Sequence, residues 1–150
     1  MTDTKITPFA DIYPLIEETI RAGHTCTFTA YGNSMAPTIR GGKDRVTLSP
    51  IEGDIERYDI VFYRRDDGAF VLHRIIKIQK DNSFWLCGDN QYTIEKDIRR
   101  DQIIARLTLV ERDQKILYRR QGKGRFPFSG LRRFLIHIRN SLLDRLGFVR

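Results

Sequence analysis

The sequence predicts a mainly β domain whose antiparallel sheet is barrel-like or sandwich-like. Short segments rich in β-branched and aromatic residues recur along the chain at short, even spacing. Turn-forming residues, among them Asp67-Gly68 and Asp81-Asn82, separate neighbouring segments as in β-hairpins. Helical periodicity is confined to the two ends of the chain.

A helix is expected first, over residues 8–22, because apolar residues recur there at helical spacing and Gly23 can end the helix. Its apolar face comprises Ile12, Leu15, Ile16 and Ile20. Pro14 fits the first helical turn, where the missing amide proton costs nothing. Seven strands are expected to follow, over residues 25–31, 45–50, 58–65, 69–78, 83–87, 103–112 and 115–120.

The basic residues are concentrated at the C-terminal end. The 150 residues carry a net charge of +7, but residues 119–150 alone contain nine Lys and Arg residues and one acidic residue. Beyond a linker with Gly and Pro, one helix face collects Leu131, Phe134, Leu135, Ile138, Leu142 and Leu146. We therefore divide the chain into an N-terminal helical segment (1–24), a β domain (25–120) and a linker with a basic amphipathic helix (121–150).

Two interpretations of this basic helix remain open, and a third is not expected. It packs on the β domain, or it attaches the protein to an anionic membrane surface, which would be a peripheral contact. Nucleic-acid binding is not expected, because no recognisable binding module accompanies the helix. Neither a signal peptide nor a membrane-spanning segment is recognisable, which favours a cytoplasmic protein, at the membrane surface if the helix binds there. Two cysteines and three scattered histidines predict no disulfide framework and no metal site, and no cofactor is expected.

Ser34 lies in the segment Gly-Asn-Ser-Met-Ala-Pro-Thr, which has two interpretations. The first is an ordinary turn. The second is a nucleophile, which would need a neighbouring base to take the hydroxyl proton and donors aimed at the oxyanion. Gly32 would let a substrate backbone approach closely, and Met35 would anchor the turn in the core.

His73 is the strongest candidate for that base. It lies within the predicted strand 69–78, on the face that should also carry Ile75 and Lys77. An ordinary histidine pKa near 6.5 suits a general base at neutral pH. A half-buried histidine with no chemical role is the alternative, and Lys77 is a weaker candidate because it would have to lose its proton.

Carboxylates that could orient an imidazole follow the predicted strand 83–87. They are Asp89, Glu95 and Asp97. A carboxylate in this position would stabilise the protonated imidazole, as in a catalytic triad. The sequence pattern leaves the choice among the three open.

Five segments, in their order and spacing, resemble the signal peptidase I and LexA-type serine peptidase superfamily. They are the Ser34 segment, the strands around residues 60 and 73, the Gly88-Asp89-Asn90 turn and the strand after residue 102. The resemblance covers about residues 25–110 and implies a coiled, mostly antiparallel β fold. It implies that Ser34 is the nucleophile. It further implies that His73 replaces the usual lysine base, as in archaeal and endoplasmic-reticulum signal peptidases.

The same resemblance nominates further site residues. Asp89 matches the aspartate of the family's Gly-Asp-Asn box, and Asp97 roughly matches its later acidic residue. Gly32 stands where signal peptidases often carry a serine, so the Ser34 and Met35 amides are expected to supply more of the oxyanion hole. Gly32, Asn33 and Met35 are the implied oxyanion and substrate-binding residues.

The predicted function is a serine endopeptidase that cleaves a leader or precursor peptide without a cofactor. A non-catalytic peptide-binding protein with the same fold is one alternative. A LexA-like regulator that cleaves itself, for example at Ala22-Gly23, is another. It is disfavoured because only about 22 residues precede the catalytic region, too few for a helix-turn-helix domain.

Overall fold

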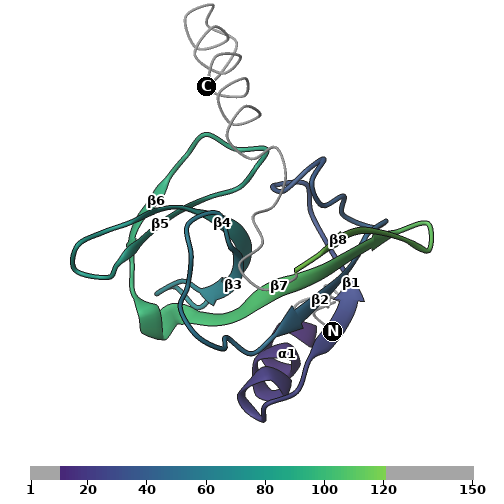
Figure 1. Cartoon of the computed structure of the whole chain (residues 1–150), viewed down its shortest axis with the longest axis horizontal. Helices are drawn as coiled ribbons and strands as arrows, with labels where there is room; N and C mark the ends of the chain where they lie inside the picture. Colours follow the sequence, from purple (N-terminus) through teal and green to yellow (C-terminus); the bar gives the residue numbers. More distant parts are fainter. Residues whose placement is uncertain (1–10, 121–150) are drawn as a thin grey trace, which may run out of the picture.

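The computed structural model describes residues 11–120 as one helix and an eight-stranded antiparallel sheet (Figure 1). The elements are α1 (Ile12–Arg21), β1 (Cys26–Thr29), β2 (Arg45–Ser49), β3 (Ile60–Arg64), β4 (Phe70–Ile78), β5 (Phe84–Cys87), β6 (Glu95–Ile98), the short 3-10 helix η1 (Arg100–Gln102), β7 (Ile103–Arg112) and β8 (Lys115–Arg119). The strand order is β1-β2-β7-β3-β4-β5-β6, and β8 pairs with β7. The predicted mainly β class is confirmed, but the sheet stays open between β1 and β6 rather than closing into a barrel.

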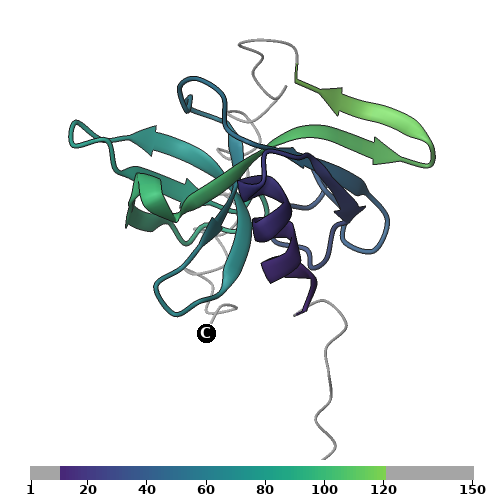
Figure 2. The same cartoon turned by 90° about the horizontal axis from the view of Figure 1, so that it is seen from below.

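The long strand β7 joins the two halves of the sheet. Arg106 pairs with Ser49 of β2 and with Val61 of β3, so these two strands lie on opposite edges of β7. Val110 likewise lies between β2 and β8, so β3 and β8 use successive parts of the same edge. Figures 1 and 2 show the result: β1, β2 and α1 lie on one side of β7, and β3 to β6 lie on the other.

The strand β3 is buried on both faces and separates two hydrophobic cores. Ile60 and Phe62 belong to the first core, which also contains Ile16 and Ile20 of α1. Val61 and Tyr63 belong to the second core, built with β4, β5 and β6. Neighbouring residues of a strand point to opposite faces. A side chain on β4 therefore faces one core or the other, according to its position in the strand.

All seven predicted strands are present, but β6 was not predicted. Its sequence Glu-Lys-Asp-Ile has only one apolar residue, so it lacks the alternation that marks a half-buried strand. As the last strand of the path it needs little apolar surface, and Ile98 alone is buried. The prediction for Leu15 was wrong as well: Ile16 and Ile20 are buried, whereas Leu15 is 59% exposed.

Two predictions concern residues outside the described range. The basic amphipathic helix after residue 120 lies there entirely, and the predicted start of the first helix at residues 8–10 lies there too. Within residues 11–120, no helix is long and apolar enough to cross a membrane.

The double burial of β3 makes its core residues sensitive to truncation. We expect Phe62→Ala to lower the free energy of unfolding by about 3–5 kcal/mol, because it removes a ring that stacks on Phe70 and leaves a cavity. Urea unfolding followed by circular dichroism would measure the loss. Ile116→Ala, on the exposed face of β8, is the matched control and should cost under about 1 kcal/mol. Equal losses for the two variants would contradict this description of the core.

Candidate active site

The turn that carries Ser34 connects β1 to β2. Gly32 has a φ of 77°, a conformation that glycine adopts without strain. A side chain on Gly41 would meet the Gly32 carbonyl oxygen at 2.0 Å, so the two ends of the turn pack backbone to backbone. Met35 is buried in the first core, as expected, and its carbonyl accepts a hydrogen bond from the Ile39 amide at 2.9 Å. Ser34 lies between Gly32 and Met35 in this turn and is half-buried.

A second turn, Gly88-Asp89-Asn90, follows β5 and holds the first one in place. The Asn90 amide donates to the Ser34 carbonyl at 2.8 Å, and its side-chain amide donates to the Asn33 carbonyl at 3.1 Å. A Cβ on Gly88 would lie 2.5 Å from the Ser34 carbonyl oxygen and 3.1 Å from His73 Nε2. Glycine is therefore needed at position 88 for the two turns and the histidine to meet.

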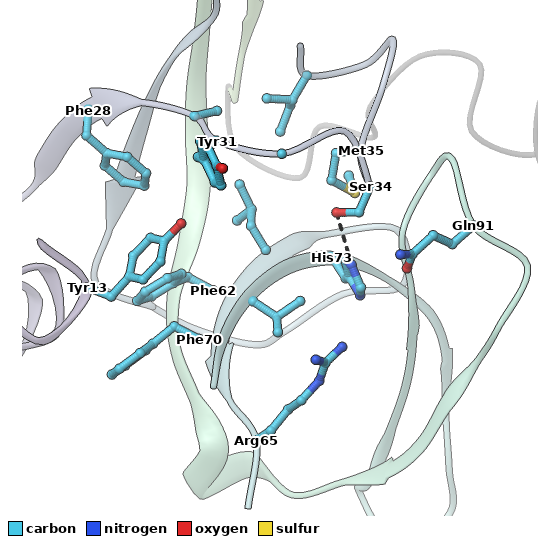
Figure 3. A pocket seen from close by; sticks show the side chains of 15 residues that line it. Tyr13, Phe28, Tyr31, Ser34, Met35, Phe62, Arg65, Phe70, His73 and Gln91 are labelled. Atoms are coloured by element: carbon cyan, nitrogen blue, oxygen red, sulfur yellow. Dashed lines mark hydrogen bonds between the residues drawn. The ribbon is translucent and has the colours of Figure 1, made fainter. Parts of the chain in front are cut away.

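His73 lies on β4 with its imidazole buried, and it faces Ser34 (Figure 3). Its Nε2 is 3.3 Å from Ser34 Oγ. Burial lowers the pKa of His73 to about 4; Glu95 and Asp89 oppose this shift, and Arg65 adds to it. The imidazole is thus neutral at neutral pH, the form in which a nitrogen can accept a hydroxyl proton.

Two groups lie near the other imidazole nitrogen, Nδ1. The Tyr63 hydroxyl is 3.3 Å away, and Glu95 Oε1 is 3.7 Å away. Arg65 donates from Nε to both Glu95 oxygens, at 3.1 and 3.0 Å, and also from Nη2. Burial raises the pKa of Glu95, but hydrogen bonds from Arg65 and Tyr63 outweigh it, so the carboxylate stays ionised.

The other two predicted carboxylates are placed differently. Asp89 forms a buried ion pair with Arg74, which donates from Nε at 2.8 Å and from Nη2 at 2.6 Å. Thr38 of the Ser34 turn also donates to Asp89, at 2.6 Å. Asp97 is exposed and has a φ of 57°. The structure therefore places Glu95 nearest to Nδ1 of His73, and it gives Asp89 a different set of partners.

Lys77, the weaker candidate base, does not share the face of His73. The register between β4 and β5 shifts after Ile75, which pairs with Leu86, whereas Lys77 pairs with Trp85. This bulge turns Lys77 to the other face, where its Nζ lies 4.5 Å from the centre of the Trp85 ring. The expectation that Lys77 follows Ile75 was wrong for this reason.

A pocket of about 270 Å³ extends from Ser34 and His73 to a group of aromatic rings (Figure 3). Phe62 and Phe70 stack at 5.4 Å, and Tyr13 of α1 lies 6.0 and 5.9 Å from them. The remaining lining residues are Phe28, Ala30, Tyr31, Gly32, Met35, Ile39, Arg65, Val71, Leu72 and Gln91. Sequence reasoning missed the aromatic residues and Gln91, since they come from four separate elements and two loops and form no motif.

Two further features bear on chemistry. The amides of Ser34 and Met35 donate no hydrogen bond within residues 11–120, so they can receive a negatively charged oxygen. In the same range, no three His, Cys, Asp or Glu side chains are grouped as metal ligands.

Comparison with known proteins gives one finding that bears on this site. The family model described as Peptidase S24-like matches residues 2–108, which includes both turns and β4. Among curated proteins, none matches the chain significantly.

The burial of His73 has a consequence for pH. Because its folded pKa is about 4 and its ordinary value is 6.5, the unfolded chain binds more protons between these values. We therefore expect His73 to lower stability progressively as the pH falls from 6.5 to 4. An NMR titration of the His73 ring should show a midpoint near pH 4, and His73→Gln should make the loss of stability shallower. A midpoint at or above pH 6 would contradict the dominance of burial over the charges of Glu95, Arg65 and Asp89.

The ion pair of Asp89 also predicts a specific stability effect. Asp89→Asn should lower the free energy of unfolding by about 3–5 kcal/mol, because the buried Arg74 charge loses its counterion. Urea unfolding would measure this loss. Glu17→Gln, which breaks the exposed ion pair with Arg21, is the control and should cost under about 1 kcal/mol. A cost below about 1 kcal/mol for Asp89→Asn would show that the turn does not depend on this pair.

Proposed function

Because the chain belongs to the Peptidase S24-like family, we propose that it is a serine endopeptidase with Ser34 as nucleophile and His73 as general base. The observation that carries this proposal is the 3.3 Å contact between Ser34 Oγ and the Nε2 atom of a buried, neutral imidazole. These two residues are 39 positions apart in the chain. Family membership supports peptidase chemistry, and the contact supports the assignment of roles.

The reaction would proceed through an acyl-enzyme. Ser34 Oγ attacks the carbonyl carbon of the scissile peptide bond while its proton moves to His73 Nε2. The Ser34 and Met35 amides, which donate no hydrogen bond within residues 11–120, would be available to stabilise the oxyanion that forms. The intermediate collapses to an ester on Ser34, and the leaving amine takes the proton from His73. Water then attacks the ester by the same route, with His73 as base, and releases the carboxylate product.

The edge of β4 supports an extended peptide as substrate. β5 pairs with β4 only from Arg74 onward, so residues 70–73 have no strand on that edge within the described residues. Ile75 points its backbone groups to the β3 side: its amide donates to the Asp59 carbonyl and its carbonyl accepts from the Tyr58 amide, just before β3 begins. By alternation, the backbone groups of Leu72 point to the unpaired edge. A peptide that adds there as a strand would pass beside Ser34.

The pocket supports an apolar side chain near the scissile bond. Phe70 and Leu72 line it on one face of β4, and Val71 and His73 line it on the other. Side chains on both faces of β4 can line the same pocket only if the pocket runs along the edge of that strand. A side chain of the peptide that points to the Phe70 face would contact Phe62 and Tyr13, and burial of such a side chain contributes about 1.5–3 kcal/mol to binding. We therefore propose as substrate an extended segment of a leader or precursor peptide that carries an apolar side chain near the scissile bond.

Self-cleavage at Ala22-Gly23 has less support. Ala22 has helical φ and ψ angles of −76° and 0°, and its amide is bonded to the Glu18 carbonyl at the end of α1. A bond in this conformation does not lie extended along the edge of β4. Peripheral attachment to a membrane through residues 121–150 stays a prediction, because these residues lie outside the described range. A cytoplasmic location stays a prediction as well.

The test is cleavage of a peptide library that places apolar residues at varied positions, followed by mass spectrometry. We expect Ser34→Ala and His73→Ala each to lower kcat/KM by at least about 10³-fold. Ser49→Ala and His24→Ala are matched controls away from the pocket and should cleave like the parent. Cleavage by the two site variants at the parental rate would refute the roles given to Ser34 and His73. A parent that binds peptides without cleaving any would favour the non-catalytic alternative.

A further inference from the structure

The proposed reaction requires one tautomer of His73. Nε2 accepts the Ser34 proton only if the resting ring carries its proton on Nδ1. Burial removes water as a partner for Nδ1, so a protein group has to accept that proton. The identity of this acceptor decides whether His73 holds its proton on Nδ1, the tautomer that the reaction needs, before substrate binds.

Tyr63 provides the nearest oxygen at hydrogen-bonding distance. Its hydroxyl lies 3.3 Å from Nδ1, whereas the closer Glu95 oxygen lies at 3.7 Å, beyond a hydrogen bond. Tyr63 lies on β3 opposite Val71. Two residues earlier in β3, Val61 lies opposite His73, so the two pairs are neighbours on one face. Its ring is fully buried in the second core. The hydroxyl is therefore held against the imidazole by packing on every side.

Glu95 is the acceptor available to the Tyr63 proton. The Tyr63 hydroxyl and Glu95 Oε1 lie beside the same atom, His73 Nδ1, at 3.3 and 3.7 Å, and Arg65 donates to both oxygens of the carboxylate. Burial and the nearby Glu95 raise the pKa of Tyr63, so the phenol keeps its proton, while Glu95 stays ionised. A phenol has one proton to donate. With that O–H directed at Glu95, the Tyr63 oxygen has only lone pairs to offer to Nδ1.

We propose that Tyr63 is the positioning residue of this site: its hydroxyl accepts the Nδ1–H of His73 and donates to Glu95, so that the lone pair of Nε2 faces Ser34. The proposal deepens the assignment of His73 as base and rests on it. Tyr63 touches neither substrate nor Ser34 in this arrangement. It acts through His73, and Arg65 acts one step further away by holding Glu95.

The arrangement also places a negative charge where it is needed during the reaction. When His73 takes the Ser34 proton, the ring becomes positive and its Nδ1–H keeps pointing to Tyr63. The dipole of the Tyr63 hydroxyl then stabilises this positive charge directly. The Glu95 carboxylate, which aligns that dipole, stabilises the charge from beyond Tyr63. No proton leaves Tyr63 or reaches Glu95 in any step.

The test reads the tautomer directly and needs no substrate. Long-range ¹⁵N–¹H correlation spectra of the full-length protein at pH 7 distinguish a protonated Nδ1 from a protonated Nε2. We expect the parent to show His73 with the proton on Nδ1. Tyr63→Phe should shift the ring toward the Nε2-protonated form, and Glu95→Gln should do so in part. Tyr118→Phe, which removes a half-buried phenol in β8, is the matched control and should leave the parental spectrum.

The parent spectrum can overturn the proposal even if Tyr63→Phe does not fold. A parent ring protonated on Nε2, or a folded Tyr63→Phe variant still fully protonated on Nδ1, would overturn it. On a cleaved peptide, Tyr63→Phe should lower kcat about 10- to 10³-fold with KM changed less than about threefold. If no peptide is cleaved, the peptidase assignment fails, while the spectra still decide the role of Tyr63.

Discussion

One buried carboxylate connects the segments that form the site. Asp89 accepts two hydrogen bonds from Arg74, the residue after His73 in β4, and one from Thr38, four residues after Ser34. The strand of the proposed base and the turn of the proposed nucleophile are thus tied to the same group. Asp89 and Arg74 are 3% and 1% exposed, so each charge depends on the other. This network ties together the two segments that bring Ser34 Oγ to 3.3 Å from His73 Nε2.

The electrostatics around His73 favour a neutral ring at rest; in the proposed reaction the ring becomes charged only when it takes the Ser34 proton. Burial outweighs Glu95 and Asp89, which would otherwise raise the pKa of the imidazole. Arg65 neutralises part of the Glu95 charge and contributes to the same result. A base of low pKa is available over a wide pH range, but it is a weaker proton acceptor. In the proposed arrangement the Tyr63 hydroxyl dipole at Nδ1 would compensate for this weakness, because it stabilises positive charge only when that charge appears.

One strand serves two purposes because β5 pairs with only part of it. The C-terminal part of β4 pairs with β5 and is part of the scaffold, while residues 70–73 have no strand on that edge within residues 11–120, beside the proposed nucleophile. Such an edge would invite aggregation if it were long and flat. Here the edge is short and lies in a pocket bounded by α1, β1 and the Ser34 turn. The aromatic rings that stabilise the first core also form one wall of this pocket, so stability and specificity share residues.

The sequence by itself determined the β class, seven of the eight strands and the pairing of Ser34 with His73, because alternation and turn residues are local signals and the ordered motifs resemble a known family. It did not determine β6, the bulge that turns Lys77 away, or the partner of Nδ1. Asp89, Glu95 and Asp97 carry the same functional group within nine positions, and local pattern cannot rank them. Only the tertiary structure decided that Asp89 pairs with Arg74 and that Tyr63 and Glu95 face His73. Those contacts depend on strand register and on side-chain packing between strands that are distant in sequence.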